Sequence, residues 1–136
     1  MIHLKNIVKA FEASWKADTA YDKSDWTEDN KARGQCVVSS LVVQDYLGGD
    51  LLRYSIEAEN LDETHYINQL DDGTLIDTTG KQYVTPVSSR LKPIDLKGFN
   101  SAREKMLCDE DTRSRYELLK ARVVSYMSDS IIDISS

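Results

Sequence analysis

The spacing of apolar residues predicts a helix near the start of the chain and a second helix before its middle. Leu4, Ile7, Val8, Phe11 and Trp15 recur at spacings of three and four, which is the pattern of an amphipathic helix. Residues 35–47 have a far more apolar helical pattern, which ends at two consecutive glycines. Such an apolar helix is expected in the middle of the fold, covered on more than one side.

The pattern changes to a period of two after these glycines. Apolar and polar side chains alternate in residues 51–59, which predicts a half-buried strand. The segment ENLDE at residues 59–63 predicts a turn, residues 65–70 a second strand, and residues 74–79 a third strand after the turn sequence DDG. A fourth short strand is expected near residues 81–85.

Helical patterns return in the last third of the chain. Pro86 and Pro93 interrupt the segment after the strands, and Asn100 is expected to cap a short helix over residues 101–107. A final helix is predicted to begin at Asp111 or Thr112. Its buried side consists of Tyr116, Leu119, Val123 and Met127, with Lys120 at the edge. Residues 128–136 are predicted either to fray or to add a small strand.

This order of elements predicts an α+β fold, with a central cysteine-bearing helix packed on a small antiparallel sheet and with flanking N- and C-terminal helices. A chain of 136 residues is expected to form a single domain spanning residues 1–136. Hydrophobic residues make up 40% of the chain and charged residues 29%, which indicates a globular rather than a disordered protein.

Charge and hydropathy exclude two classes of partner. The formal net charge of −6 argues against a general nucleic-acid binder, because phosphate contacts need a dense basic surface. The first residues carry acid and base within two turns, unlike a signal peptide, and no run approaches the roughly 18 apolar residues of a membrane span. The sequence therefore predicts a cytoplasmic protein with neither a membrane nor a nucleic acid as partner.

The cysteine and histidine content argues against a metal site. The chain has two cysteines, Cys36 and Cys108, without CxxC spacing, and only two histidines. A structural zinc site needs about four closely arranged ligands, so neither a metal nor an organic cofactor is expected. Both thiols are expected to be free, and Cys108 is expected to be structural because its acidic neighbours are unfavourable for a thiolate.

Cys36 has the strongest indication of chemistry. It is predicted to lie in the first turn of the apolar helix, after Gly34 and Gln35 rather than after a side chain that caps helices well. A helix N-terminus favours a thiolate, and its unpaired N–H groups can bind a developing oxyanion. Gly34 is expected to let a substrate backbone approach closely. The alternative is that Cys36 is a small buried residue of the core.

His65 and Asp77 are the candidate partners of this thiol, because a Cys–His pair needs a third polar group that orients the imidazole. A two-residue turn at DDG would make Asp77 face away from His65. A three-residue turn over residues 71–73 would pair Ile67 with Asp77 and place Asp77 diagonally from His65 on the same face. The DDG sequence favours the three-residue turn, with the cysteine helix packed across this face.

Three further residues are candidates for the walls of the site. Asn30 lies six residues before Cys36 in the loop that leads to the helix, and its amide is a candidate donor to an oxyanion. Gln35 is a rival for that role. Trp26 is a candidate for the wall of the cleft. The alternatives are an ordinary loop position for Asn30 and a core position for Trp26.

These residues lie in segments that resemble the YunG-like family of uncharacterised bacterial proteins. The resemblance rests on NKARGQCVVSSLVVQDYLGGDLLR, THYINQLDDGTLIDTTGKQY and DTRSRYELLKARV, and it spans the chain from about Trp26 to Val123. The segments RGQC and QDYLGG are its most specific parts. This likeness implies a family but supplies little established function.

A wider resemblance is to the papain-like and transglutaminase-like cysteine fold. In that fold a cysteine opens a central helix, and a histidine and an acid or amide follow on adjacent antiparallel strands. The order Cys36, His65, Asp77 is similar, and an amide upstream of the cysteine serves the oxyanion hole in papain-like enzymes, as Asn30 would here. No Ser-Cys-Trp segment surrounds Cys36, so the flanking sequence differs from that of papain.

Two functional hypotheses of different classes follow from these residues. The first is a thiol hydrolase or acyltransferase that acts on an unknown peptide or small amide, with Cys36 as nucleophile, His65 as base and acid, and Asp77 as the orienting group. The alternative is a non-catalytic binding module that retains the same fold, with His65 bonded to a backbone carbonyl and Asp77 capping a turn. A third possibility is a subunit of a larger assembly.

Overall fold

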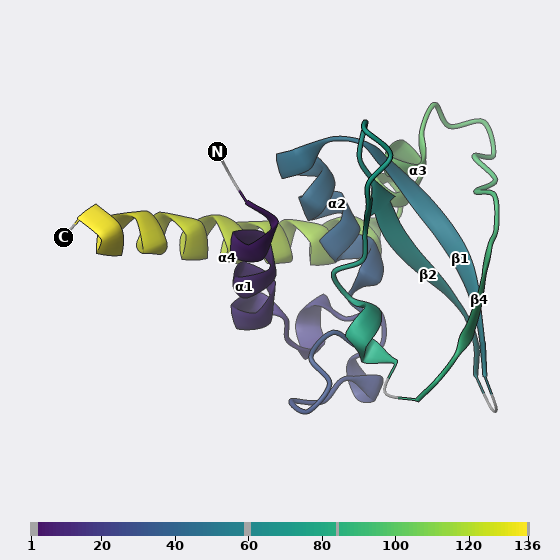
Figure 1. Cartoon of the computed structure of the whole chain (residues 1–136), viewed down its shortest axis with the longest axis horizontal. Helices are drawn as coiled ribbons and strands as arrows, with labels where there is room; N and C mark the ends of the chain where they lie inside the picture. The colour runs from purple at the N-terminus through teal and green to yellow at the C-terminus, as the bar shows by residue number, and fades with distance from the viewer. Residues whose placement is uncertain (1–2, 59–60, 84, 136) are drawn as a thin grey trace.

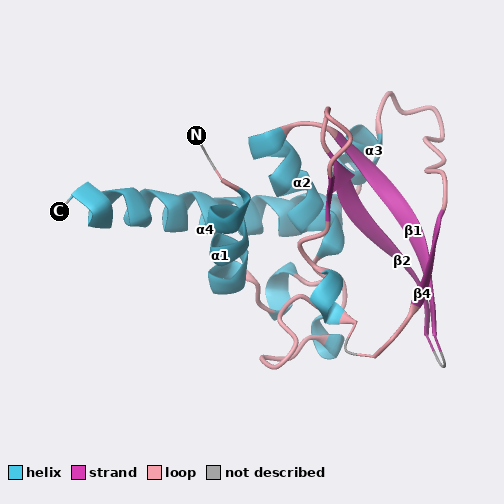
Figure 2. Cartoon of the chain, in the orientation of Figure 1, coloured by secondary structure: helices cyan, strands magenta, loops and turns pink. Residues whose placement is uncertain are grey.

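The fold has helices on one side and a sheet on the other. The computed structural model describes residues 3–58, 61–83 and 85–135, with side chains up to residue 129. Helix α4 (Glu110–Ser135) runs behind the other helices and projects away from the sheet (Figure 1), and Figure 2 separates the two layers by colour. The α+β class is therefore confirmed. The elements are α1 (Leu4–Ser14), α2 (Cys36–Leu47), β1 (Asp50–Ala58), β2 (Leu61–Gln69), β3 (Leu75–Ile76), β4 (Ser88–Leu91), α3 (Ala102–Cys108), α4 (Glu110–Ser135), and three short 3-10 turns, η1 (Ala17–Thr19), η2 (Lys23–Asp25) and η3 (Gly80–Gln82).

Helix α2 lies in the middle of the fold, as its apolar sequence predicts, because α4 and β2 both pack against it. The Trp15 indole of the first segment donates a hydrogen bond of 2.9 Å to the Ser39 hydroxyl on α2, which satisfies two buried polar groups at once. The main core joins the three long helices and consists of Ile7, Ala10, Phe11, Trp15, Ala32, Val38, Val42, Val43, Leu119 and Val123.

The sheet has the strand order β3-β2-β1-β4 and is antiparallel throughout. The turn between β2 and β3 has the predicted three-residue form. Asn68 pairs with Ile76 and Gln69 with Leu75, and the Leu70 N–H donates to the Thr74 carbonyl at 2.9 Å. This register places His65 and Asp77 on one face, so the prediction from DDG is confirmed.

Two predictions about the strands are wrong. The segment ENLDE does not form only a turn, because β2 already begins at Leu61 and pairs with β1 through Asp62 and Glu63; residues 59 and 60 lie outside the described part of the chain. The strand expected near residues 81–85 is replaced by η3. The fourth strand, β4, follows Pro86 and pairs with β1 instead.

Two predictions about the C-terminal helices are also corrected. The side chain of Ser101, rather than Asn100, caps α3 by accepting a hydrogen bond of 3.0 Å from the Glu104 N–H. The final helix begins at Glu110 and continues to Ser135, so the described part of residues 128–136 neither frays nor forms a strand. Its buried side is as expected, with Leu119 and Val123 fully buried.

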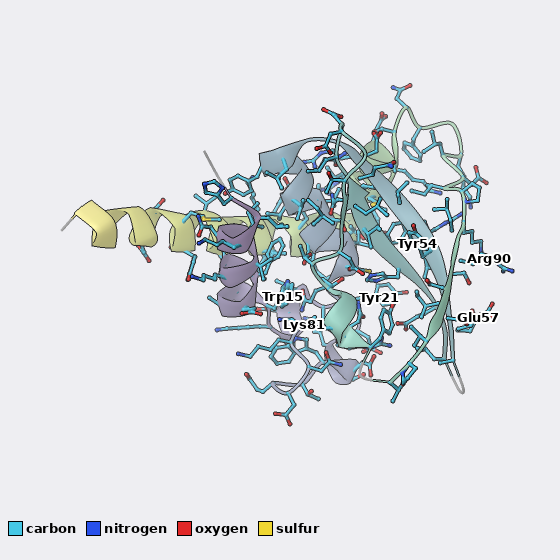
Figure 3. All side chains as sticks on the ribbon, viewed as in Figure 1. Trp15, Tyr21, Tyr54, Glu57, Lys81 and Arg90 are labelled. Atoms are coloured by element: carbon cyan, nitrogen blue, oxygen red, sulfur yellow. The ribbon has the colours of Figure 1, made fainter. Side chains whose placement is uncertain are left out.

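Contacts to α1 hold the η3 segment in place. The Lys81 ammonium lies 5.7 Å from the centre of the Trp15 ring and pairs with Glu12. Figure 3 labels Trp15 and Lys81, which lie near each other at the base of α1. Because Lys81 is fixed on this outer side, the next residue, Gln82, extends into the protein and is 5% exposed.

Candidate active site

Cys36 is the first residue of α2, as the sequence predicts. The residue before it, Gln35, makes no side-chain capping bond, and the first N–H groups of a helix have no intrahelical partner. Cys36 is partly exposed and lines a cavity of about 310 Å³. The thiol is therefore accessible from solvent and stands at the positive end of the helix dipole.

Gly34 is required by its own backbone and by a neighbouring segment. Its φ angle is +76°, a conformation that favours glycine, and a Cβ atom there would lie 3.1 Å from the Tyr21 backbone nitrogen. The Tyr21 N–H donates to the Gly34 carbonyl at 2.9 Å. The expected close approach at Gly34 thus comes from the protein's own chain, which fixes the entry to α2.

His65 and Asp77 form a hydrogen-bonded pair, with 2.9 Å between His65 Nε2 and Asp77 Oδ1. The same carboxylate oxygen accepts a hydrogen bond from the Thr79 N–H at 3.3 Å. Gly80 leaves the space that this carboxylate occupies, since a Cβ atom at Gly80 would lie 2.8 Å from Asp77 Oδ2. The imidazole is 3% exposed, so its orientation is fixed by its surroundings.

The charge state of His65 follows from competing effects. Burial alone would lower the pKa of the imidazole, because a buried cation loses hydration. The hydrogen bond to Asp77, together with hydrogen bonding and charge from Cys36, outweighs burial and raises the pKa of His65 to about 9. At neutral pH the ring is therefore an imidazolium between a carboxylate and a thiol group.

Gln82 lies between the ring and the segment before Cys36. Its Nε2 lies 3.5 Å from His65 Nδ1, and its Oε1 accepts a hydrogen bond of 3.2 Å from the Gly34 N–H. Gln82 also lines the cavity that Cys36 lines. The sequence does not indicate this residue, because the pattern around it predicts a strand and only the contact between η3 and the segment before α2 brings Gln82 to the site.

Two arginines line the same cavity, of which Arg115 is buried and Arg33 is partly exposed. Arg33 forms two hydrogen bonds to Glu63, of 2.6 and 2.7 Å, and a third to Asp25 of 2.7 Å. The bonds to Glu63 raise the pKa of the Arg33 guanidinium against the opposing effect of burial. Arg115 reaches the cavity from α4, with Tyr21 beside it. Arg33 lies three residues before Cys36 in the chain, whereas Arg115 is brought to the cavity only by tertiary contacts.

The two predicted amide donors lie elsewhere. The amide nitrogen of Asn30 donates to the Gln82 carbonyl at 2.9 Å, and Asn30 lines a separate cavity with Lys81. The amide nitrogen of Gln35 donates to the Lys16 carbonyl at 3.0 Å, and the residue is fully buried. The structure therefore gives no support to an oxyanion role for Asn30 or Gln35.

Trp26 does not line the cavity of Cys36 among the described residues, because its indole donates to the Lys31 carbonyl at 2.9 Å within its own loop. The expected position of α2 across the His65 face also needs correction. The hydrogen bond from the strand to α2 comes from Asn68, whose amide donates to the Ser40 carbonyl at 2.9 Å. Asn68 points to the face opposite His65, since side chains alternate along a strand.

The thiol and the imidazole face neighbouring cavities. Cys36 lines the cavity of about 310 Å³ with Gln82 and Tyr66. His65 and Asp77 line a second cavity of about 430 Å³ on the outer face of the sheet, floored by apolar side chains. The Tyr83 ring packs edge-on against the imidazole, with 5.3 Å between centres. Cys36 and His65 are thus among the lining residues of two different cavities.

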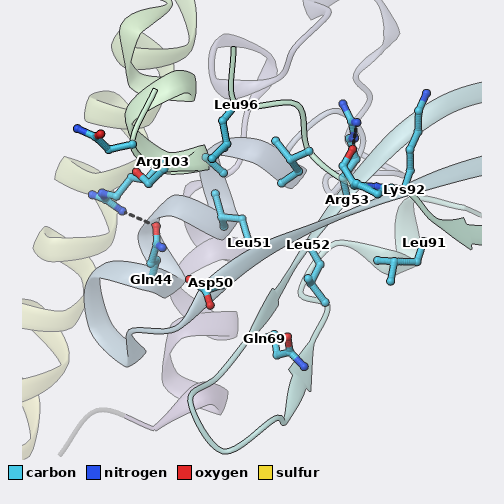
Figure 4. A pocket seen from close by; sticks show the side chains of 15 residues that line it. Gln44, Asp50, Leu51, Leu52, Arg53, Gln69, Leu91, Lys92, Leu96 and Arg103 are labelled. Atoms are coloured by element: carbon cyan, nitrogen blue, oxygen red, sulfur yellow. Dashed lines mark hydrogen bonds between the residues drawn. The ribbon is translucent and has the colours of Figure 1, made fainter. Parts of the chain in front are cut away.

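A larger cavity of about 640 Å³ lies between α3 and the start of β1 (Figure 4). Arg103 closes one end of it by donating to Gln44 at 3.1 Å. No cysteine, serine–histidine pair or carboxylate pair is among its described lining residues. Its chemistry suits ligand binding rather than nucleophilic catalysis.

Other site types find no support in the described segments. Within residues 3–58, 61–83 and 85–135, no three His, Cys, Asp or Glu side chains gather as metal ligands. None of the helices in the part that the structure describes combines the length and apolarity needed to cross a bilayer.

Comparisons with known proteins found a matching family and a curated relative. The sequence profile of a family described as "YunG protein" matches residues 3–128. "Uncharacterized protein YunG" from Bacillus subtilis (strain 168) is 29% identical over 121 residues, which cover 89% of this chain and 90% of that protein. No solved structure matches the chain.

Proposed function

We propose that this chain, which belongs to the YunG family, is a cysteine-dependent hydrolase or acyltransferase acting on an amide or a related acyl group. One observation carries the proposal: an imidazole bonded to a carboxylate lies beside an accessible thiol at a helix N-terminus. The order Cys36, His65, Asp77 matches that of the papain-like fold, and a relationship to that fold is part of the proposal.

The charge of His65 decides how the reaction begins. Because the pKa of His65 is raised to about 9, the ring is protonated at neutral pH and does not act first as a base. It instead stabilises the Cys36 thiolate as an ion pair, as in other activated thiols. Asp77 is hydrogen-bonded to Nε2 of the ring. The other ring nitrogen, Nδ1, lies on the side of Gln82.

The proposed reaction acylates Cys36 and then deacylates it, and it needs no cofactor. The Cys36 thiolate attacks the carbonyl carbon, a C–S bond forms, and the carbonyl electron pair moves to oxygen. When that pair returns, the C–N bond breaks and the leaving amine takes the proton of the His65 imidazolium. The neutral ring then takes a proton from the water or alcohol that attacks the thioester, and cleavage of the C–S bond restores the thiolate.

The oxyanion of this reaction would be bound by the Cys36 N–H and the Gln82 amide. The first is a free first-turn donor, and the second lines the same cavity as the thiol. Gln82 is favoured over Asn30 and Gln35 because the amide nitrogens of those two residues donate to backbone carbonyls.

The second candidate function is a binding module, and the cavity in Figure 4 favours it. That cavity is larger than the one at Cys36, and Arg53, Lys92 and Arg103 line it. In this case His65 and Asp77 would only stabilise the hairpin. Reaction at Cys36 separates the two candidates, because a binding module needs no reactive thiol.

The test is acyl transfer to the full chain from a panel of p-nitrophenyl esters and acyl thioesters. We expect a burst of nitrophenolate and an acyl adduct on Cys36, located by peptide mass spectrometry. Cys36→Ser should lose both, and the matched variant Cys108→Ser should keep both. An absence of adduct with every ester, or equal adducts on Cys36 and Cys108, would favour the binding module.

Gln82→Met tests the oxyanion role separately. Removing one oxyanion donor costs about a hundredfold in acylation rate, whereas alkylation of Cys36 by iodoacetamide passes through no oxyanion and should change little. Equal losses in both reactions would mean that Gln82 only supports the entry to α2.

A further inference from the structure

The cavity at Cys36 has an asymmetric distribution of charge. Arg33 and Glu63 both line it, but they neutralise each other through two short hydrogen bonds. Asp25 adds a second negative partner to Arg33. Arg33 is therefore more than compensated by these two carboxylates, and the remaining positive charge at the cavity comes from α4.

Arg115 supplies that remaining charge. The residue is 6% exposed, lines the cavity and lies 5.8 Å from the centre of the Tyr21 ring. Its carboxylate partner, Asp111, is 70% exposed and pairs with Nε alone, at 2.9 Å. A salt bridge to such an exposed partner is weakened by solvent.

The terminal nitrogens of Arg115 are weakly engaged within the part of the chain that the structure describes. Nη1 donates to the Thr19 carbonyl at 3.3 Å, and Nη2 contacts the Thr112 hydroxyl at 3.5 Å. A guanidinium has five N–H donors in a planar fork that matches a carboxylate. Arg115 thus retains donor capacity next to the cavity that the thiol lines.

We propose that the substrate carries a carboxylate on the portion bound beside Cys36, and that Arg115 recognises it. This inference rests on the proposed function, because it defines the substrate class of the same thiol. It explains why a chain with net charge −6 buries a cation with only partial compensation at this place. A cavity of about 310 Å³ is at the small end for ligand sites, so the bound portion is small.

The test uses two alkylating reagents of almost equal size on the full chain, iodoacetate and iodoacetamide. Labelling of Cys36 and Cys108 is followed by peptide mass spectrometry, and the ratio of the two rates is compared between the two thiols. We expect iodoacetate to be favoured at Cys36 relative to Cys108. Added salt should lower the iodoacetate rate at Cys36 and leave the iodoacetamide rate unchanged.

Variants of Arg115 make the test specific. Arg115→Met should lower the iodoacetate-to-iodoacetamide ratio at Cys36 about tenfold by removing the cation, with little effect on iodoacetamide itself. Arg115→Lys keeps the charge and should keep most of the ratio. Arg113→Met, an exposed position on the same helix outside the cavity lining, is the matched control. Thermal unfolding of each variant confirms that it is folded.

The outcomes separate this inference from the proposed function. If Cys36 reacts with iodoacetamide but the ratio equals that of Cys108, is insensitive to salt and is unchanged in Arg115→Met, the carboxylate inference is wrong and the reactive thiol remains. If Cys36 reacts with neither reagent, the proposed function fails, and the inference fails with it. If Arg115→Met does not fold, Arg115→Gln decides the matter, because it also removes the charge of Arg115 and leaves that of His65 in place.

Discussion

The two cysteines of this chain stand at opposite ends of helices and in opposite surroundings. Cys36 begins α2, lines a cavity and lies beside His65. Cys108 ends α3, is exposed, and precedes Asp109 and Glu110. A helix N-terminus stabilises a negative charge and a C-terminus opposes it. The same side chain is thus placed for chemistry at one site and against it at the other.

The comparison shows that the position on a helix is only one part of the difference. At Cys36, the hairpin register brings Asp77 to His65, and η3 adds Gln82 from a third segment. Nothing comparable surrounds Cys108 among the described residues, where the nearby hydrogen bonds serve helix capping. The predictions below therefore alter the surroundings of Cys36 and use Cys108 as the internal reference.

The largest effect is expected in the pH dependence of stability. The pKa of His65 is raised from about 6.5 to about 9 on folding, so folding favours the protonated ring. This contribution is fully present below pH 6.5 and is lost as the pH rises through about 9. Each pKa unit corresponds to about 1.4 kcal/mol, which gives roughly 3 kcal/mol in all. Urea unfolding from pH 6 to 10 measures it.

His65→Gln should flatten this part of the pH profile, while His3→Gln, at the other and exposed histidine, should leave it intact. Profiles of wild type and His65→Gln that coincide from pH 6 to 10 would contradict the raised pKa of His65. Cys108→Ser should have no influence on the profile.

The next effect is on the reactivity of Cys36. In wild type, iodoacetamide should label Cys36 much faster than Cys108 at neutral pH. His65→Ala should slow labelling of Cys36 roughly a hundredfold, because the imidazolium no longer stabilises the thiolate. Labelling of Cys108 in the same sample should not change. Equal, slow labelling of both thiols in wild type would contradict the proposed difference in reactivity between Cys36 and Cys108.

A smaller loss is expected when the ring keeps its place but loses its carboxylate. Asp77→Asn should slow labelling of Cys36 roughly tenfold, since the hydrogen bond at Nε2 no longer ends on a charged oxygen. Asp72→Asn, in the turn of the same hairpin, changes an exposed carboxylate that accepts a hydrogen bond from the Thr74 N–H and serves as the control. A full rate in Asp77→Asn would mean that Asp77 does not support the imidazolium.

The smallest effect is expected from Gly80→Ala. The added Cβ atom would lie 2.8 Å from Asp77 Oδ2, so the carboxylate must shift and its bond to His65 must weaken. Labelling of Cys36 should fall a few-fold. The double variant with Asp77→Asn should be no slower than Asp77→Asn alone, because both changes act through one contact. Additive losses would show a separate role for Gly80.

Sequence patterns were sufficient for those parts of the site that depend on local structure. The position of Cys36 follows from the periodicity of α2 and the glycines that end it. The placement of His65 and Asp77 on the same face of the sheet follows from the length of one turn, which the sequence DDG specifies. In both cases neighbouring residues in the chain determine the geometry.

Sequence patterns failed where distant segments meet. Gln82 and Arg115 reach the cavity from η3 and α4, and no periodicity indicates that these segments pack near Cys36. Asn30 was predicted as a donor because it lies close to Cys36 along the chain, yet its amide bonds to the Gln82 carbonyl. Turns and long-range packing therefore decide which amide reaches the thiol.

The most direct test of the thiol–imidazolium pair is an NMR titration of the His65 ring in wild type, Cys36→Ser and Cys108→Ser. Because Asp77 and Cys36 together raise the pKa of His65 to about 9, the wild-type and Cys108→Ser midpoints should lie near that value. Cys36→Ser should lower the midpoint, since it removes the thiol's contribution. A wild-type midpoint near 6.5, or one that Cys36→Ser leaves unchanged, would contradict the account.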